Sequence, residues 1–367
     1  LIPQLPFDNR KCHLSDEEIA KSDVSHLTMC EVASEALSDA NYDPFNLPQR
    51  NAGVYFGHTG GSAIAGEIMY AIGIEQTAQY LHDVEGLRDL PKSQREEIIG
   101  KIIDDTRRAY DFRTENSHVR LAPVAGCELI ARAFGLNGPC LVVDAACASS
   151  LQALAIGARA LVHKTIDMAI FGGASCCKGD SLVLFSAAQS VTAGKSRPFD
   201  EGANGLVTSE GYVTLIIKRL EDAIAAGDRI RGVIRGVGMS SDGKGKSLWA
   251  PLKDGQKLAI RRAYDDQLRP TDIQFMEAHA TSTQVGDATE LAVLAESFPA
   301  EQPSEQKIPL GSVKANIGHT LETAGLAGLL KTMLAMEHGI IPPCANLETP
   351  NTEIDWDKLP FYLPREA

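Results

Sequence analysis

The chain has 367 residues, of which 44% are hydrophobic and 23% are charged. This length and composition predict one large or two fused globular domains with a substantial core. The formal net charge of −13 argues against a nucleic-acid-binding surface, because such surfaces are basic. No apolar run in the sequence approaches the ~20 residues that a membrane-spanning helix needs.

The eight cysteines do not form a recognisable metal-binding or disulfide pattern. No two of them have the CxxC spacing of a zinc or redox site. Scattered cysteines in a chain of this length, without a signal peptide, predict reduced thiols and a cytoplasmic location. The loop-like start at Leu1 suggests a piece of a longer protein.

Short apolar strands alternate with helical patterns, which is typical of a mostly parallel sheet covered on both faces. Helices are predicted at Ser15–Asp39, Ala63–Arg108, Leu121–Phe134, from the turn at Cys147 to about His163, and at Glu221–Ala226, Gln256–Leu268, Ala288–Ser297 and Leu321–His338. Strands are predicted at Asn51–Gly57, Leu141–Val143, Asp167–Ala174, Tyr212–Lys218, Arg231–Met239, Ile273–Ala278 and Ile308–Val313. The charged faces of Ala63–Arg108 predict a solvated surface, an insertion or a dimer arm.

One strand–turn–helix unit occurs twice. The segments that begin at Pro139 and Pro309, an offset of 170 residues, both contain a proline, an apolar strand, a turn of small residues and a small-residue helix. A duplicated half-domain whose two turns meet at the centre would bring Cys147 and His319 together.

Cys147 is a candidate nucleophile in the first of these turns. Its small neighbours leave room for a substrate. If a helix begins here, its unpaired N–H groups and its dipole would lower the pKa of the thiol. On this segment alone, a buried and unreactive cysteine is equally compatible.

Two of the nine histidines, His279 and His319, follow predicted strands and have small or hydroxyl-bearing neighbours. Such positions let a side chain reach a pocket at the carboxyl end of a sheet. Taken singly, each histidine is more often a packed structural residue.

Four blocks of the sequence resemble the motifs of β-ketoacyl synthases, the condensing-enzyme domains of fatty-acid and polyketide synthases. VDAACASSL at Val143–Leu151 is similar to the nucleophile motif Asp-Thr-Ala-Cys-Ser-Ser-Ser-Leu. KSRPFDEGANGLVTSEG at Lys195–Gly211 resembles the Arg-Pro-Phe-Asp loop and the glycine-rich strand entry after it. EAHATSTQVGDATE at Glu277–Glu290 and VKANIGHTLETAG at Val313–Gly325 resemble the two histidine blocks. Order and spacing agree over roughly residues 15–360.

The resemblance implies a thiolase-like α/β fold, with two duplicated αβαβα halves in five layers. The first half would comprise residues 1–220 with a helical insertion at about 60–118, and the second half residues 221–367. The length of the insertion is similar to that of iterative synthases that make polyenes, polyunsaturated fatty acids or glycolipid chains.

The resemblance also implies roles for individual residues. Cys147 would accept the acyl chain, and His279 and His319 would handle the extender unit. Lys314 would orient or neutralise that region, and Glu322 would hold it by hydrogen bonds. The residues that would bind substrate are Thr281, Thr283, Phe199 and Asn316, with the two threonines along the phosphopantetheine arm.

The implied reaction is a decarboxylative Claisen condensation between the acyl chain on Cys147 and a malonyl-type thioester. The partners would be an acyl carrier protein, acyl and malonyl thioesters, a second copy of the chain across the strand Cys140–Val143, and the other domains of a synthase. The phosphopantetheine arm of the carrier would present the substrates. Neither a metal ion nor a cofactor bound by the chain is implied.

Three features depart from the family pattern. Gly-Thr-Gly-Thr is replaced by Ala280-Thr281-Ser282-Thr283, which predicts a narrower pantetheine channel or a restricted turn. The helical region Ala63–Arg108 is long for a polyketide ketosynthase. The sequence also contains neither the Gly-Phe-Gly-Gly-Thr-Asn block, which contributes an oxyanion-hole amide, nor the family's opening strand.

Two alternatives remain open. A non-catalytic partner of the chain-length-factor type would keep the fold but lose the nucleophile, and the presence of Cys147 together with His279 and His319 argues against it. A thiolase-type acyltransferase would carry a second catalytic cysteine late in the chain. The only late cysteine, Cys344, lies in a proline-rich loop.

Overall fold

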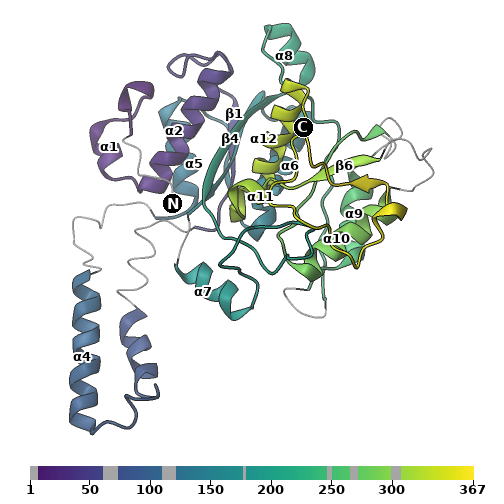
Figure 1. The fold of residues 1–367 in the computed structure, drawn as a ribbon. Helices are drawn as coiled ribbons and strands as arrows, with labels where there is room; N and C mark the ends of the chain where they lie inside the picture. Colours follow the sequence, from purple (N-terminus) through teal and green to yellow (C-terminus); the bar gives the residue numbers. More distant parts are fainter. Residues whose placement is uncertain are drawn as a thin grey trace.

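The computed structural model describes residues 7–60, 73–109, 121–176, 179–245, 250–264, 272–298 and 307–367. Its first sheet has the strand order β2-β1-β3-β4 (Figure 1). The strands are β1 (Ala52–Gly57), β2 (Cys140–Val143), β3 (Met168–Ser175) and β4 (Gly211–Lys218). β1 is parallel to β2 and β3, and β4 is antiparallel to β3. β1 and β3 are buried along their whole length, as expected for covered parallel strands.

Helices cover both faces of this sheet. α2 (Val24–Asp39) and α5 (Val124–Ala133) contact one another and the sheet, whereas α6 (Ser149–Val162) contacts β1, β2 and β3. The core on the α2 side includes Met29, Ile130 and Phe56, and the core on the α6 side includes Leu154 and Phe171. These two clusters on opposite faces make the first half a three-layer unit.

The helix predicted at Ser15–Asp39 is interrupted. α1 (Asp16–Ala20) begins with the capping box of Ser15 and Glu18, as predicted. A second N-cap follows at Asp23, whose side chain accepts a hydrogen bond from the Ser25 N–H and starts α2. An aspartate that caps a new helix competes with continuation of the preceding one, which explains the break.

The second half is built on a parallel sheet of order β5-β6-β7. Its strands are β5 (Met276–Glu277), β6 (Ile308–Gly311) and β7 (Phe361–Tyr362), and its long helices are α9 (Lys253–Ala263), α10 (Gln284–Ser297) and α12 (Ala324–His338). The α9 and α10 side chains pack on this sheet around Leu310 and Phe361. α12 contacts both β5 and α6, so α6 and α12 form a shared central layer. The five layers predicted from the resemblance are therefore present.

The prediction of a strand at Arg231–Met239 is wrong. These residues are in no regular element, and none of the described residues pairs with them in a ladder. The segment instead lies against α9, where Gly236 and Gly238 approach the carbonyl oxygens of Ala263 and Ala259. A strand requires a hydrogen-bonded neighbour, and an apolar alternating pattern alone does not supply one.

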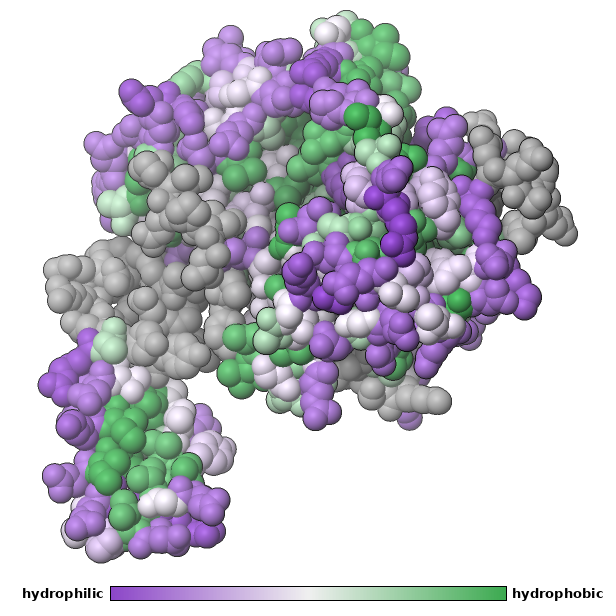
Figure 2. Space-filling model, in the orientation of Figure 1, coloured by the Kyte–Doolittle hydropathy of each residue, from purple (hydrophilic) through white to green (hydrophobic). Residues whose placement is uncertain are grey.

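A helical arm projects from the body (Figure 1). It consists of a helix whose described part is residues 73–81 and of α4 (Lys92–Ala109). Ile74, Ala78 and Ile99 are buried, and Figure 2 shows hydrophobic side chains gathered along the line between the two helices. The helical prediction for Ala63–Arg108 is confirmed for these ranges, and its first residues lie outside the described part.

Four further short elements lie outside the site. They are η1 (Asn9–Lys11), α7 (Gly179–Ala187), α8 (Leu220–Ala226) and η6 (Trp356–Lys358). No helix in the described ranges combines the length and hydrophobicity needed to cross a bilayer. The end of the helix predicted at Gln256–Leu268 lies outside those ranges.

Candidate active site

Two sharp turns meet at the centre of the molecule. After β2 the chain enters η3 (Ala146–Ala148) through Ala146, whose φ is 48°, and continues into α6. After β6 it passes through α11 (Lys314–Ile317) and His319, enters η5 (Leu321–Thr323) through Leu321, also at a φ of 48°, and continues into α12. η3 contacts η5, as α6 contacts α12. The repeat seen in the sequence thus brings Cys147 and His319 together, as predicted.

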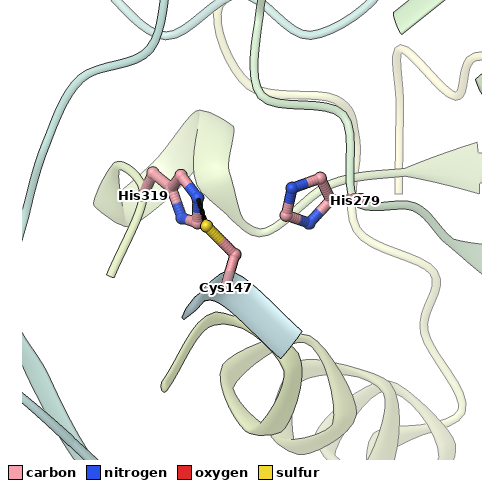
Figure 3. A group of neighbouring side chains, drawn as sticks. All are labelled: Cys147, His279 and His319. Carbon is pink, nitrogen blue, oxygen red and sulfur yellow. Dashed lines mark hydrogen bonds between the residues drawn. The ribbon is translucent and has the colours of Figure 1, made fainter. Parts of the chain in front are cut away.

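Cys147, His279 and His319 form one cluster (Figure 3). The Cys147 Sγ lies 3.0 Å from Nε2 of His319. The His279 and His319 rings are nearly perpendicular, with their centroids 5.3 Å apart. One nitrogen or sulfur atom of each residue lies within 4.8 Å of the others, so a single small group can contact all three.

Backbone hydrogen bonds fix the position of His319. Its N–H donates to the carbonyl oxygen of Val207 at 2.7 Å, and its carbonyl oxygen accepts from the N–H of Ser209 at 2.9 Å. Gly318, with a φ of 76°, lies so close to the Val207 carbonyl that a Cβ would come within 2.9 Å of it. The loop around Val207–Ser209 therefore supports His319, a role that the sequence analysis missed.

A carboxylate fixes the turn that carries His279. Oε1 and Oε2 of Glu290, on α10, accept hydrogen bonds from the backbone N–H groups of His279 and Ala280 at 2.8 and 2.7 Å. The sequence analysis did not select Glu290. The available signal was its place in the same block as His279, eleven residues further on, at the spacing that a turn followed by a helix requires.

Lys314 is buried beneath the cluster, with 3% of its surface exposed. Burial lowers the pKa of its ammonium group, and the charges of Glu290 and Glu277 oppose that shift. Glu277 accepts a hydrogen bond from the Val313 N–H and pairs with Lys331 at 2.7 Å, so it also anchors the start of α11. The Lys314 charge acts on all three members of the cluster.

The pKa of the Cys147 thiol is raised to about 11. Burial is the main cause, with a further contribution from the Glu322 charge, while Lys314 and the backbone N–H of Cys147 act in the opposite direction. The net shift is therefore upward, although the sequence predicted a lowering by the helix N-terminus. Desolvation of a thiolate outweighs a helix dipole that acts over only the first turn.

Both imidazoles have lowered pKa values. His319 is 2% exposed, and burial followed by the His279 and Lys314 charges lowers its pKa well below the usual value. Burial and the Lys314 charge also lower the pKa of His279, although more than a third of that residue is open to solvent. We therefore expect the pKa of His279 to be lowered by less than the pKa of His319. Two neutral imidazoles offer N–H donors without adding positive charge.

Among the described residues, Glu322 does not make the hydrogen bonds expected of it. It is 7% exposed, and its Oε1 accepts from Oγ1 of Thr59, in the loop after β1. The hydrogen bonds that hold the region around Lys314 and the two histidines come instead from Glu277, Glu290 and the backbone of residues 207–209.

The four predicted substrate-binding residues are not equally accessible. The Thr281 and Thr283 hydroxyls lie 3.1 Å apart in the turn after His279, and Asn316 is exposed on α11. Phe199 is 2% exposed, adopts a φ of 63°, and donates its backbone N–H to Asp287 at 3.0 Å. Its ring packs in the core of the second half, so the structure does not bring Phe199 to the surface of the site.

Family models match nearly the whole chain. Residues 4–223 match the N-terminal domain of β-ketoacyl synthases, and residues 231–348 match their C-terminal domain. Together with the paired turns and the Cys-His-His cluster, these matches define a condensing-enzyme domain of thiolase-like fold. The chain belongs to the β-ketoacyl synthase family.

Relatives and solved structures agree with this assignment. The chain is 34% identical to 6-methylsalicylic acid synthase of Aspergillus niger over 98% of the chain and 18% of that protein. It is 32% identical to one subunit of the polyunsaturated fatty acid synthase of a Thraustochytrium species over 95% of the chain and 12% of that protein. A ketosynthase from module 6 of the bacillaene synthase of Bacillus subtilis superimposes with a TM-score of 0.78 at 29% identity, covering 98% of this chain and 55% of that one. The chain spans only 6% to 18% of the length of eight curated relatives that it matches.

Proposed function

We propose that the chain catalyses decarboxylative condensation, with Cys147 as the acyl-carrying nucleophile. The observation that carries the proposal is the 3.0 Å contact between the Cys147 Sγ and Nε2 of His319, with the His279 ring beside it. A thiol and an imidazole in contact can transfer a proton as the sulfur attacks.

In the first half-reaction the Cys147 sulfur attacks the carbonyl carbon of an acyl thioester. His319 takes the thiol proton, the new carbon–sulfur bond forms, and the bond to the leaving thiol breaks. The proton then returns to that leaving thiolate. Proton transfer to His319 is needed because burial disfavours a free thiolate at Cys147.

In the second half-reaction a malonyl-type thioester loses carbon dioxide and becomes an enolate. N–H groups of His279 and His319 donate to the enolate oxygen, and the lowered pKa of each ring keeps it neutral near pH 7. The carbanion attacks the acyl thioester on Cys147, the carbon–sulfur bond breaks, and the released thiolate takes a proton from solvent to restore the thiol. The product is a β-ketoacyl thioester, and Lys314 offsets the negative charge that develops in the site.

The substrates of this reaction are proposed from the same resemblance. A phosphopantetheine arm on an acyl carrier protein would reach the cluster along Thr281 and Thr283, with Asn316 at the exposed end. The relatives named above are a 6-methylsalicylic acid synthase and one subunit of a polyunsaturated fatty acid synthase, in keeping with a place in a multidomain synthase. The same proposal includes a division of the chain into two halves at about residue 220. It also includes a homodimer that forms across the outer strand β2.

Acylation of the full chain with a short acyl thioester, followed by peptide mass mapping, tests the proposal. We expect the label on Cys147, and none in Cys147→Ala. Cys344→Ala is a matched control, because Cys344 is also partly buried and its pKa is also raised to about 11 by burial. Label on Cys344 would favour the thiolase-type alternative. A Cys147→Ala variant that still condensed would refute the mechanism.

A further inference from the structure

Glu322 occupies, in the second half, the position that Cys147 occupies in the first. Each is the middle residue of a single 3-10 turn whose first residue has a φ of 48°, and each turn leads directly into a central helix. The two turns are in contact. The duplicated fold therefore places a carboxylate in one turn next to the nucleophile in the other turn.

The Glu322 carboxylate is buried, and only one of its oxygens is hydrogen-bonded among the described residues. Glu322 is more than nine-tenths buried. One oxygen accepts from Thr59, whereas the other, Oε2, is buried without a hydrogen-bond partner among the described residues. Burial of an unpartnered carboxylate oxygen is costly.

Four titratable residues surround Cys147, and two of them are charged near pH 7. Lys314 on α11 favours the thiolate, and Glu322 on η5 opposes it. His279, after β5, and His319, before η5, have lowered pKa values and stay neutral near pH 7. Glu322 therefore adds to burial in opposing Lys314 at the sulfur. Without Glu322, burial would still oppose the Lys314 charge, but the repulsion between the carboxylate and a thiolate would be gone.

We propose that Glu322, held by Thr59, keeps unacylated Cys147 in its thiol form. The thiol would persist until an acyl thioester binds, the sulfur attacks it and His319 accepts the proton. The inference rests on the proposed role of Cys147. It assigns Glu322 to the control of the nucleophile's reactivity, in place of a hydrogen-bonding role toward the histidines. A thiol reacts far more slowly than a thiolate with small electrophiles and oxidants, so the carboxylate would protect the unacylated enzyme.

The test is the pH profile of Cys147 alkylation by iodoacetamide in the full chain, followed by peptide mass mapping. Glu322→Gln keeps the shape of the side chain and removes its charge. We expect its alkylation at pH 7–8 to be about threefold to tenfold faster than in the wild type, with the profile moved to lower pH. The gain is smaller than the gain in thiolate fraction, because a less basic thiolate is a weaker nucleophile.

Two controls separate this effect from a structural one. Glu337→Gln makes the same change near the other end of α12, where Glu337 pairs with Arg229 and Arg231, and its profile should match the wild type. Acylation of Glu322→Gln by an acyl thioester at pH 9 should label Cys147, which shows that the site is intact. As a second variant, Glu322→Asp retains the charge and should stay within about twofold of the wild type in alkylation rate, since charge is the feature that matters.

Different results would refute this inference and the proposed function. A wild-type Cys147 that takes no acyl label would refute the proposed function. A wild-type Cys147 that is acylated, with the same alkylation profile in Glu322→Gln, would refute only the role of Glu322. An Asp variant as fast as the Gln variant would also overturn it.

Discussion

His279 and His319 face the same sulfur from turns that are built in different ways. Backbone hydrogen bonds on both sides hold His319 to Val207 and Ser209, and only 2% of it is exposed. In the His279 turn, the N–H groups of His279 and Ala280 both donate to one side chain, that of Glu290, and more than a third of His279 is open to solvent. The comparison is between a histidine whose own N–H and carbonyl groups pair with the backbone and one whose N–H pairs with a carboxylate side chain.

The difference in construction suggests a division of labour. His319 contacts the Cys147 Sγ and can serve both acyl transfer and decarboxylation. His279 lies toward the open side, where an extender unit would enter, and has no hydrogen bond to the sulfur among the described contacts. We therefore expect His279 to matter for the second half-reaction alone.

The largest expected effect separates the two histidines directly. His319→Ala should lower malonyl decarboxylation by about 10³-fold and slow acylation of Cys147 by about 10²-fold, since it removes both a donor to the enolate and the proton acceptor. His279→Ala should lower decarboxylation by about 10²- to 10³-fold and leave acylation within about threefold. Release of carbon dioxide and intact-mass acylation measure the two steps. An equal loss of acylation in both variants would contradict the division of labour.

Removal of the carboxylate at the His279 turn should have the next largest effect. Glu290→Gln keeps one acceptor for two N–H groups, so the turn loses one charge-assisted hydrogen bond, worth about 1.5–3 kcal/mol. We expect decarboxylation to fall by about 10- to 100-fold with little change in acylation. Glu296→Gln, on the exposed end of the same helix, is the matched control. If Glu290→Gln impaired acylation as strongly as decarboxylation, the carboxylate would support the whole site instead of one turn.

The pH dependence of decarboxylation should be weak. Each ring has a folded-state pKa below the usual 6.5, so it stays neutral as pH falls through 6.5 and gains a proton only at lower pH. We expect the decarboxylation rate to change less than about twofold between pH 8 and pH 6. The unfolded chain binds these protons near pH 6.5, so the free energy of unfolding should decrease as pH falls below that value. A rate that halves near pH 6.5 would show that one imidazole titrates normally.

The sequence predicted the members of the cluster better than it predicted their chemical state. Cys147, His279 and His319 each lie at a strand–turn position, and the repeat accounted for the contact between Cys147 and His319. The raised pKa of Cys147 could not be predicted, because burial depends on how the two halves pack. The roles of Glu290 and of Val207–Ser209 were missed because their contacts are to backbone atoms, which leave no residue-type signature. The predicted strand at Arg231–Met239 failed for a related reason, since its apolar pattern says nothing about whether a neighbour is available.

The smallest expected effect concerns Ser282, where the family has glycine. Its φ of 66° is costly for a residue with a side chain, but its hydroxyl accepts a hydrogen bond from the Arg197 N–H at 2.9 Å. Ser282→Ala keeps the strain and loses the bond, so it should lower the free energy of unfolding by about 1–2 kcal/mol. Ser282→Gly also loses the bond but relieves the strain, and it should cost about 1 kcal/mol less than Ser282→Ala. Urea unfolding of the three proteins measures the order: wild type, then Gly, then Ala. Equal stabilities of wild type and Ser282→Ala would mean that this bond contributes nothing, and that the serine brings strain to the His279 turn without compensation.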